Sequence, residues 1–193
     1  MADAAALGFV LSRLEAGTAP ILWVQDRVSQ KETGRPYFPQ LSQRPMIRVD
    51  VNRPVDVLWA LEEGLRCQAL GAVIGEVWGN PAQLDFTATK RLAMRAERHD
   101  VPCWLIRHAA SPDLSAARNR WRVTSLPSQV HPHDPKAPGN PRWQAELFRT
   151  RQQKPGTWVA THDRATDRVD LIAPLRDGAM AEGHDAYRQR AAR

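Results

Sequence analysis

Apolar and polar positions alternate along the first half of the chain in a way that predicts helices and strands in turn. Expected helices cover 2–16, about 54–67 and about 85–99, and expected strands cover 20–25, 46–51, 70–78 and 103–106. The polar segment from Gln30 to Pro45 is expected to be a loop. Strands separated by helices are typical of a parallel, doubly wound sheet.

The helix expected from Pro54 shows why this reading is favoured. Pro54 and Asp56 suit the first turn of a helix, and Leu58, Leu61, Leu65 and Ala69 fall on one side of it. The segment that follows, LGAVIGEVW at 70–78, is almost continuously apolar, as a central strand buried on both faces would be. We therefore expect the helix to cover one face of the sheet.

The alternation of expected helices and strands ends at about Ser115. Strands are expected at 118–123, 142–150, 157–162 and 168–173, and a proline-rich loop is expected from Pro127 to Pro141. Short consecutive strands without helices predict an antiparallel C-terminal extension of the mostly parallel sheet. We expect one domain over 1–175 and a flexible basic tail over 176–193, which is rich in Ala, Gly and Arg.

The composition indicates a soluble protein with a basic net charge. The chain has 193 residues and a formal net charge of +6, which favours anionic partners such as nucleic acid. No apolar stretch is long enough to span a bilayer and no basic leader precedes the first helix, so the expected compartment is the cytoplasm. Cys67 and Cys103 have no ligand-spaced neighbours and are expected to be reduced, structural thiols within apolar elements.

The order of the expected elements resembles the RecA core entered just after its phosphate-binding loop, and four segments resemble the ImuA family. These segments are VDVLWALEEGLRCQALGAVIGEV at 55–77, LDFTATKRLAMRAE at 84–97, SAARNRWRV at 115–123 and NPRWQAELFRTRQQKPGTWV at 140–159. The resemblance covers about residues 1–173. It is carried by the order and spacing of the segments, because none of them is a catalytic signature.

The resemblance implies a RecA-like fold and a cytoplasmic bacterial accessory protein of SOS-associated mutagenic translesion synthesis. Its implied partners are a Y-family polymerase-like protein and an error-prone replicative polymerase subunit, with RecA and DNA as further candidates. The chain departs from longer members of the family because it lacks the segment that precedes the first helix.

The difference from longer family members also concerns nucleotide binding. A phosphate-binding loop needs a glycine-rich turn followed by lysine and Ser or Thr, and none of the four lysines follows a glycine. By the resemblance, Glu76 stands where RecA-like ATPases carry the Walker B acid, and Asp26 stands near their water-orienting carboxylate. Without phosphates to hold a magnesium ion beside them, both are interpreted as vestigial. We expect no catalysis, no cofactor and no metal.

Basic residues of the C-terminal strands are the DNA-binding candidates. They are Arg118, Arg120, Arg122, Arg142, Arg149, Arg151 and Lys154. Trp121, Trp143 and Trp158 lie among them and could stack on bases of single-stranded DNA or belong to the core.

Two helices carry further surface candidates. Arg91, Arg95 and Arg98 share one face of the helix expected at 85–99, with Phe86 and Leu92 among the residues expected toward the core; this basic face is either solvated or a phosphate contact. Trp59 lies off the leucine stripe of the preceding helix, among charges. It is either a partner-binding anchor or a residue at the rim of the core.

The function expected from these observations is that of a non-catalytic accessory protein in error-prone translesion synthesis. Two alternatives stay open at this stage. One is a regulator that binds RecA filaments, and the other is a nucleotide-dependent ATPase that relies on a partner's phosphate loop.

Overall fold

The structure is a computed structural model that describes residues 4–37, 44–163 and 168–172. The helices are α1 (Ala5–Ser12), α2 (Arg27–Thr33), α4 (Pro54–Gly64) and α5 (Phe86–His99). The strands are β1 (Ile21–Asp26), β2 (Met46–Val51), β3 (Ala72–Trp78), β4 (Cys103–His108), β5 (Arg120–Leu126), β6 (Arg142–Arg149), β7 (Gly156–Asp163) and β8 (Arg168–Ile172).

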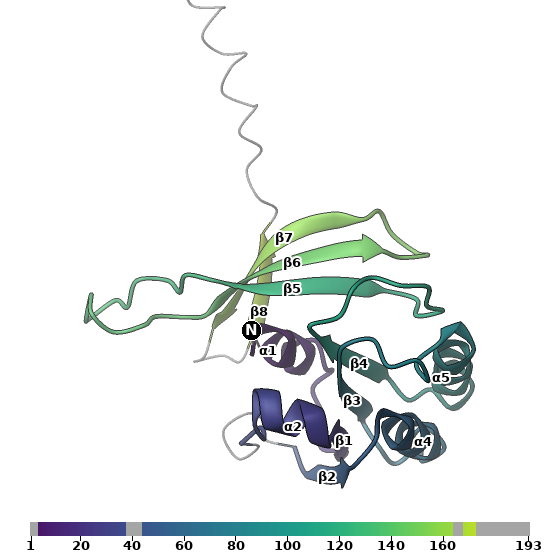
Figure 1. Cartoon of the computed structure of the whole chain (residues 1–193). Coiled ribbons are helices and arrows are strands. Elements are labelled where there is room, and N and C mark those ends of the chain that lie inside the picture. The colour runs from purple at the N-terminus through teal and green to yellow at the C-terminus, as the bar shows by residue number, and fades with distance from the viewer. Residues whose placement is uncertain (1–3, 38–43, 164–167, 173–193) are drawn as a thin grey trace, which may run out of the picture.

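The strands form two separate four-stranded sheets. The first has the order β2-β1-β3-β4 and all its pairs are parallel, whereas the second is the antiparallel series β5-β6-β7-β8 (Figure 1). This arrangement confirms the predicted α/β class with an antiparallel C-terminal extension. The extension pairs with itself and does not continue the hydrogen bonding of the parallel sheet.

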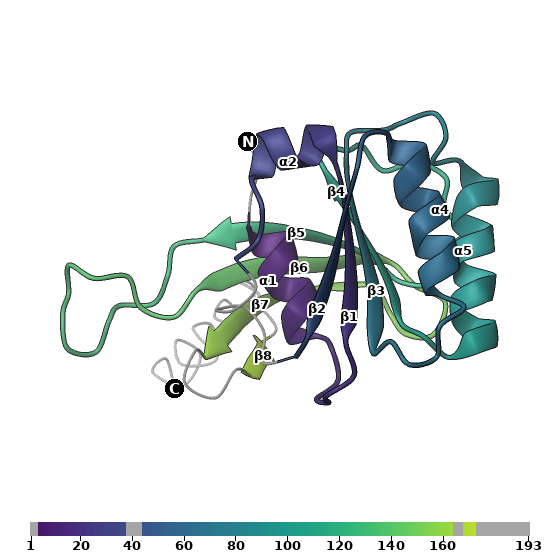
Figure 2. The same ribbon diagram turned by 90° about the horizontal axis from the view of Figure 1, so that it is seen from below.

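Helices cover both faces of the parallel sheet, as a doubly wound arrangement requires (Figure 2). On one face, Leu22 and Val24 of β1 pack with Leu61 of α4 in a core that also reaches α5. On the other face, Ile21 and Trp23 pack against α1. The nearly continuous apolar run of β1 is therefore explained by burial on both sides, as is that of β3.

Helix α1 lies between the two sheets. Its Val10 belongs to the core on the parallel sheet, whereas Phe9 packs with Trp143 and Ala145 of the antiparallel sheet. A Cβ atom on Gly8 would lie 2.6 Å from the Trp143 ring, so the missing side chain at Gly8 lets the indole approach the helix. The helix is apolar nearly all round because both sides are covered.

Local chemistry fixes where the helices on the first face begin and end. Pro54 occupies the start of α4 and Asp56 lies in its first turn, as predicted. The Asp85 carboxylate accepts a hydrogen bond of 2.7 Å from the Ala88 amide at the start of α5. That helix ends at Asp100, which adopts a left-handed conformation with φ of 54°.

The sequence prediction is wrong at the start of the loop expected over 30–45, because residues 30–33 belong to a helix. Helix α2 occupies Arg27–Thr33, and its first turn is stabilised by the side chain of Asp26. The helix is short and mostly polar, so hydrophobic periodicity could not reveal it.

Smaller corrections concern helix ends. The first helix is Ala5–Ser12 and not 2–16, and α4 ends at Gly64. Ala69 therefore lies beyond the helix and is exposed, contrary to its predicted place on the leucine stripe. Phe86 is 40% exposed and does not face the core, which α5 contacts through its buried residues Ala88, Thr89 and Leu92.

None of the helices within the described residues is long and apolar enough to cross a membrane. The single domain expected over 1–175 stays a prediction. The tail expected over 176–193 lies outside the described residues.

Candidate functional site

Asp26 lies at the carboxyl end of β1, where parallel α/β sheets commonly bind ligands. Its side chain is fully buried and accepts a hydrogen bond of 2.7 Å from the Ser29 amide, so it is the N-cap of α2. The sequence singled out this carboxylate for its position in the fold. In the structure its visible contact is with its own helix.

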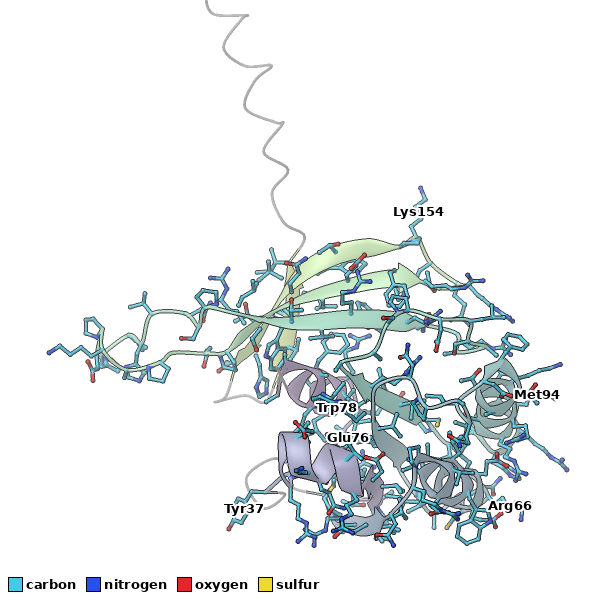
Figure 3. The ribbon with its side chains drawn as sticks, viewed as in Figure 1. Tyr37, Arg66, Glu76, Trp78, Met94 and Lys154 are labelled. Atoms are coloured by element: carbon cyan, nitrogen blue, oxygen red, sulfur yellow. The ribbon has the colours of Figure 1, made fainter. Side chains whose placement is uncertain are left out.

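Glu76 lies inside β3, two residues before the strand ends at Trp78. Its Oε1 accepts a hydrogen bond of 3.0 Å from the Thr33 hydroxyl and lies 2.8 Å from His108 Nε2. Its exposed fraction is 4%, and Figure 3 shows it close to α2. Glu76 therefore joins β3, β4 and α2 through a buried polar cluster.

His108 is the member of this cluster that sequence reasoning missed. It ends β4, is buried, and its ring stacks on Trp78 with 6.1 Å between ring centroids. The sequence showed only a scattered single histidine. Its pairing with Glu76 depends on β3 and β4 being neighbours, which the chain order alone does not fix.

The polar cluster is closed to solvent. Gln25 donates to the Gly34 carbonyl at 2.9 Å, which brings the residues after α2 back over the sheet end. One oxygen each of Gln25, Asp26, Ser29 and Glu76 is buried without a hydrogen-bond partner among the described residues. These atoms lie in the interior of the protein, out of contact with solvent.

The DNA-binding candidates divide into two groups. In the first group, each of three arginines has an acidic neighbour. Arg118 pairs with Glu97 of α5 through a hydrogen bond of 2.7 Å, and Arg122 pairs with Glu146 at 2.6 Å. Arg120 lies 3.8 Å from Asp113. These arginines are already partly neutralised.

The pKa directions agree with this pairing. The hydrogen bond from Arg118 holds the pKa of Glu97 below its ordinary value. The hydrogen bond from Arg107 does the same for the pKa of Asp113. Burial lowers the pKa of Arg120, against the opposing charge of Asp113.

The second group lies on and beside the β6–β7 turn. Arg149, Arg151 and Lys154 are exposed, and Lys154 projects away from the molecule in Figure 3. The side chains of Arg149 and Lys154 make no hydrogen bond or ion pair with the described residues, and Arg151 acts on Glu97 through its charge. Arg142 lies at the opposite end of β6, so the structure does not bring it to the others.

The tryptophans among these residues belong to the core. Trp143 is buried between α1 and the antiparallel sheet, and Trp121 contacts Phe9 and Trp158 with ring centroids 5.1 Å and 5.7 Å apart. Of the two readings left open by the sequence, the structure favours core packing. The aromatic ring on the arginine face is Phe148, over which the guanidinium groups of Arg120 and Arg122 lie at 5.0 Å and 5.3 Å.

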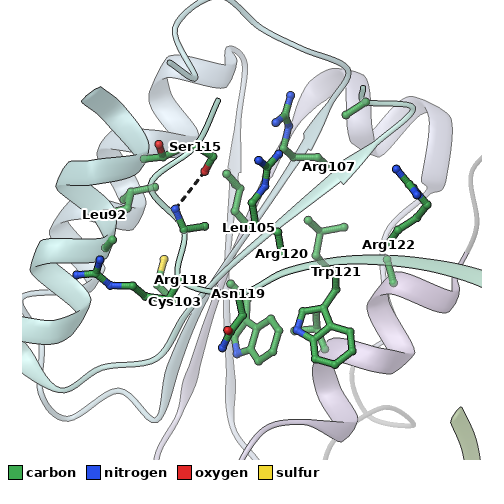
Figure 4. A pocket seen from close by; sticks show the side chains of 18 of the residues that line it. Leu92, Cys103, Leu105, Arg107, Ser115, Arg118, Asn119, Arg120, Trp121 and Arg122 are labelled. Carbon is green, nitrogen blue, oxygen red and sulfur yellow. Dashed lines mark hydrogen bonds between the residues drawn. The ribbon is translucent and has the colours of Figure 1, made fainter. Parts of the chain in front are cut away.

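A cavity of about 530 Å³ separates β4 from β5 (Figure 4). Its walls include Trp104 and Leu105 of β4, Leu92 of α5, and Arg120 and Trp121 of β5. No pattern in the sequence predicts this cleft. The related feature of the sequence is the apolar Cys103–Ile106 segment. It predicts a buried strand, whereas β4 lies at the edge of its sheet.

The basic face of α5 contacts the neighbouring helix α4, whereas the tryptophan of α4 is exposed to solvent. Arg91 and Arg95 both pair with Glu62 of α4, at 2.9 Å and 3.1 Å, so they tie the two helices together. Trp59 is 67% exposed on the outer side of α4. This exposure excludes the alternative that Trp59 closes the rim of the core.

Both cysteines are free. Cys103 is partly buried in β4, and burial raises the pKa of its thiol to about 12, which disfavours the thiolate. Cys67 is exposed just beyond α4 and is not within an apolar element as expected.

The contacts of Asp26 predict a structural effect of its replacement. Asp26→Ala should lower the free energy of unfolding by about 1 kcal/mol, the usual cost of losing an N-cap, whereas Asp26→Asn should retain most of the stability. Urea unfolding followed by circular dichroism measures both. Equal losses for the two variants would contradict the capping role.

The comparisons with known proteins agree with the resemblance found in the sequence. No family model matches the chain. Two curated relatives named Protein ImuA, from Caulobacter vibrioides strains NA1000 / CB15N and ATCC 19089 / CB 15, are each 32% identical to it over 150 residues. The match covers 70% of this chain, and the chain spans 59% of the length of each relative. Over the greater part of its length, the chain is therefore similar to ImuA.

Proposed function

We propose that this protein is a non-catalytic accessory protein in SOS-induced, error-prone translesion DNA synthesis. The similarity to the two ImuA proteins supports the pathway. The internal hydrogen bonding of Asp26 and Glu76 supports the absence of catalysis and carries this part of the proposal. The protein would act in the cytoplasm by binding other proteins and DNA.

The contacts of the two carboxylates oppose a catalytic role for either of them. A magnesium-dependent hydrolase needs acids that reach the metal and the attacking water. Here Asp26 caps a helix, and Glu76 accepts from Thr33 while it lies against His108. Neither carboxylate can serve a nucleotide unless this buried cluster opens.

Trp59 supports the protein-binding part of the proposal. It is accompanied on the outer face of α4 by Val55, which is also exposed, and exposed tryptophans are enriched among residues that dominate binding energy. Charged residues follow it in the chain, since Glu63 of α4 forms an ion pair at 3.1 Å with Arg66, which lies just beyond the helix. We assign this face to a polymerase-type partner: a Y-family polymerase-like protein or an error-prone replicative polymerase subunit.

Arg149, Arg151 and Lys154 support the DNA-binding part. They are exposed on one turn and keep their positive charge available, unlike Arg118 and Arg122, which pair with acids. A sequence-independent contact with the backbone of single-stranded DNA fits such a group. Core packing of Trp121 and Trp143 makes base stacking by these two rings a minor part of the contact.

The protein-binding role predicts the effect of Trp59→Ala in the bacterium from which the gene comes. The variant should lower the frequency of mutations induced by DNA damage toward that of a deletion strain. Truncation of such an anchor costs roughly 2 kcal/mol, about a thirtyfold loss of affinity. Val130→Ala, at an exposed position on the β5–β6 loop, is the matched control. Wild-type mutagenesis from a normally folded Trp59→Ala protein would contradict the assignment of this face.

The DNA contact predicts a change in salt dependence. Replacing Arg149, Arg151 and Lys154 by Ala should lower the slope of log affinity against log salt for single-stranded DNA by about 2, or roughly 0.7 for each phosphate contact. Fluorescence anisotropy at several salt concentrations measures the slope. A control lacking Arg13, Arg27 and Lys31, which removes the same charge elsewhere, should keep the original slope. An equal fall for both variants would assign the effect to net charge.

The absence of catalysis predicts no ATP turnover by the purified protein, alone or with single-stranded DNA, and no micromolar binding of ATP. Phosphate release and calorimetry measure the two quantities. Turnover that disappears in both Glu76→Ala and Asp26→Ala, with the folded state retained, would overturn this part of the proposal and favour an ATPase.

A further inference from the structure

Helices α4 and α5 lie side by side on one face of the parallel sheet, as Figure 2 shows. They contact the core through buried residues such as Leu58 and Leu61 of α4 and Ala88 and Leu92 of α5. The sides of the two helices away from the core form one surface, which we call the α4–α5 face. Its exposed residues are Val55, Trp59, Lys90, Arg91, Met94 and Arg98.

An ion pair between the two helices brings their apolar side chains into one patch. Glu62 of α4 accepts a hydrogen bond of 2.9 Å from Arg91 of α5 and lies 3.1 Å from Arg95. Trp59 precedes Glu62 by three residues, and Met94, which is 56% exposed, follows Arg91 by three residues. Side chains at this spacing are neighbours on a helix surface. Trp59 and Met94 therefore flank the same ion pair from the two helices.

The residue types of this patch are those of a protein-binding surface. Val55 precedes Trp59 by four residues, so it adds a third exposed apolar side chain on the same side of α4. Single exposed apolar residues are ordinary, whereas neighbouring ones on two helices are the mark of an interaction site. Tryptophan, methionine and arginine are enriched at protein–protein interfaces. The side chains of Val55 and Met94 have no partner on a phosphate backbone, which favours a protein over a nucleic acid.

The charge exposed on the α4–α5 face is mainly positive. Glu62 is shared by two arginines, and its side chain is only 14% exposed, compared with 52% for Arg91. The side chains of Lys90 and Arg98 are exposed and make no hydrogen bond or ion pair with the described residues. Glu97, the acidic residue of α5, is paired with an arginine of another segment. A partner with carboxylates would therefore match the charge of this face.

We propose that the α4–α5 face binds an acidic amphipathic helix of a protein partner. The apolar residues of that helix would cover the tryptophan, valine and methionine of the face, and its carboxylates would pair with the lysine and arginines. A helix fits, because two adjacent helices present ridges and grooves against which a third can pack. The same face of a second copy of this chain is a poor occupant, because like charges would meet.

The acidic helix rests on the proposed function in one respect, since the outer side of α4 is the surface assigned there to a polymerase-type partner. It adds α5 to that surface. It also specifies the charge and the apolar spacing of the segment that binds. A synthetic helix tests these properties without any polymerase.

The probe is a peptide of about 18 residues, with Leu at every third or fourth position and Glu and Ala elsewhere. The same peptide with Lys in place of Glu is its matched control. In NMR titrations of the full chain, the acidic peptide should shift the indole signal of Trp59 and the methyl signal of Met94. It should bind about tenfold more tightly than the basic peptide at low salt, because each exposed ion pair contributes a factor of roughly two.

Charge reversal on α5 tests the assigned contacts. Lys90→Glu combined with Arg98→Glu should weaken binding of the acidic peptide about tenfold and strengthen binding of the basic peptide. Arg27→Glu combined with Lys31→Glu makes the same change of charge on exposed positions of α2, and should alter both affinities by no more than about twofold. Trp59→Ala should weaken binding of the acidic peptide at least about tenfold.

Three outcomes would overturn the acidic helix as the occupant. The first is that the acidic peptide leaves the signals of Trp59 and Met94 unchanged. The second is equal binding of the two peptides, which would indicate apolar contact without selection by charge. The third is that an oligothymidylate of similar length shifts these signals and the acidic peptide does not, which would indicate a nucleic-acid surface.

Failure of the proposed function has a different signature. Wild-type mutagenesis in a bacterium that carries Trp59→Ala would contradict the role of this face in translesion synthesis. The binding of the acidic peptide by the purified protein would be unaffected by that result. The two failures are therefore distinguishable.

Discussion

The packing of α1 between the two sheets is the contact on which the rest of the structure depends. Phe9 and Val10 are neighbours in sequence, yet one joins the core of the antiparallel sheet and the other joins the core of the parallel sheet. Gly8 allows Trp143 to lie directly against the helix. Because the sheets share no hydrogen bonds as neighbouring strands, burial on α1 is a main link between them.

The position of α1 also explains the cleft between β4 and β5. A helix that separates two sheets holds their facing edges apart, and Phe9 and Val10 of α1 themselves line the resulting cavity. The edges of β4 and β5 are therefore not paired with each other. On β4, backbone amides and carbonyls face away from β3, and the side chains at the start of this strand are apolar.

Polar groups elsewhere are used to join elements. Glu76 connects β3, β4 and α2, Asp26 caps α2, and Glu62 holds two arginines of α5 against α4. In each case a charged side chain that could have been free for a ligand is hydrogen-bonded or ion-paired within the fold. Among the DNA-binding candidates, Arg149 and Lys154 at the β6–β7 turn form no ion pair with an acidic side chain of the described residues.

The sequence by itself determined the α/β class, most element positions and the division into parallel and antiparallel halves. These features follow from local periodicity: the strand at Met46–Val51 and the start of α4 at Pro54 were predicted to the residue. The resemblance to ImuA likewise needed only the order of four segments. Helix α2 escaped because seven mostly polar residues carry no periodic signal.

Only the tertiary structure decided what the individual side chains do. Arg118 and Glu97 are 21 residues apart, and Glu76 and His108 are 32 apart, so their pairing depends on which elements become neighbours. The exposure of Trp59 and the burial of Trp143 also depend on which surfaces other elements cover. The open edge of β4 is the clearest case. An apolar strand looks the same in sequence whether it has one neighbour or two, and only the strand order tells them apart.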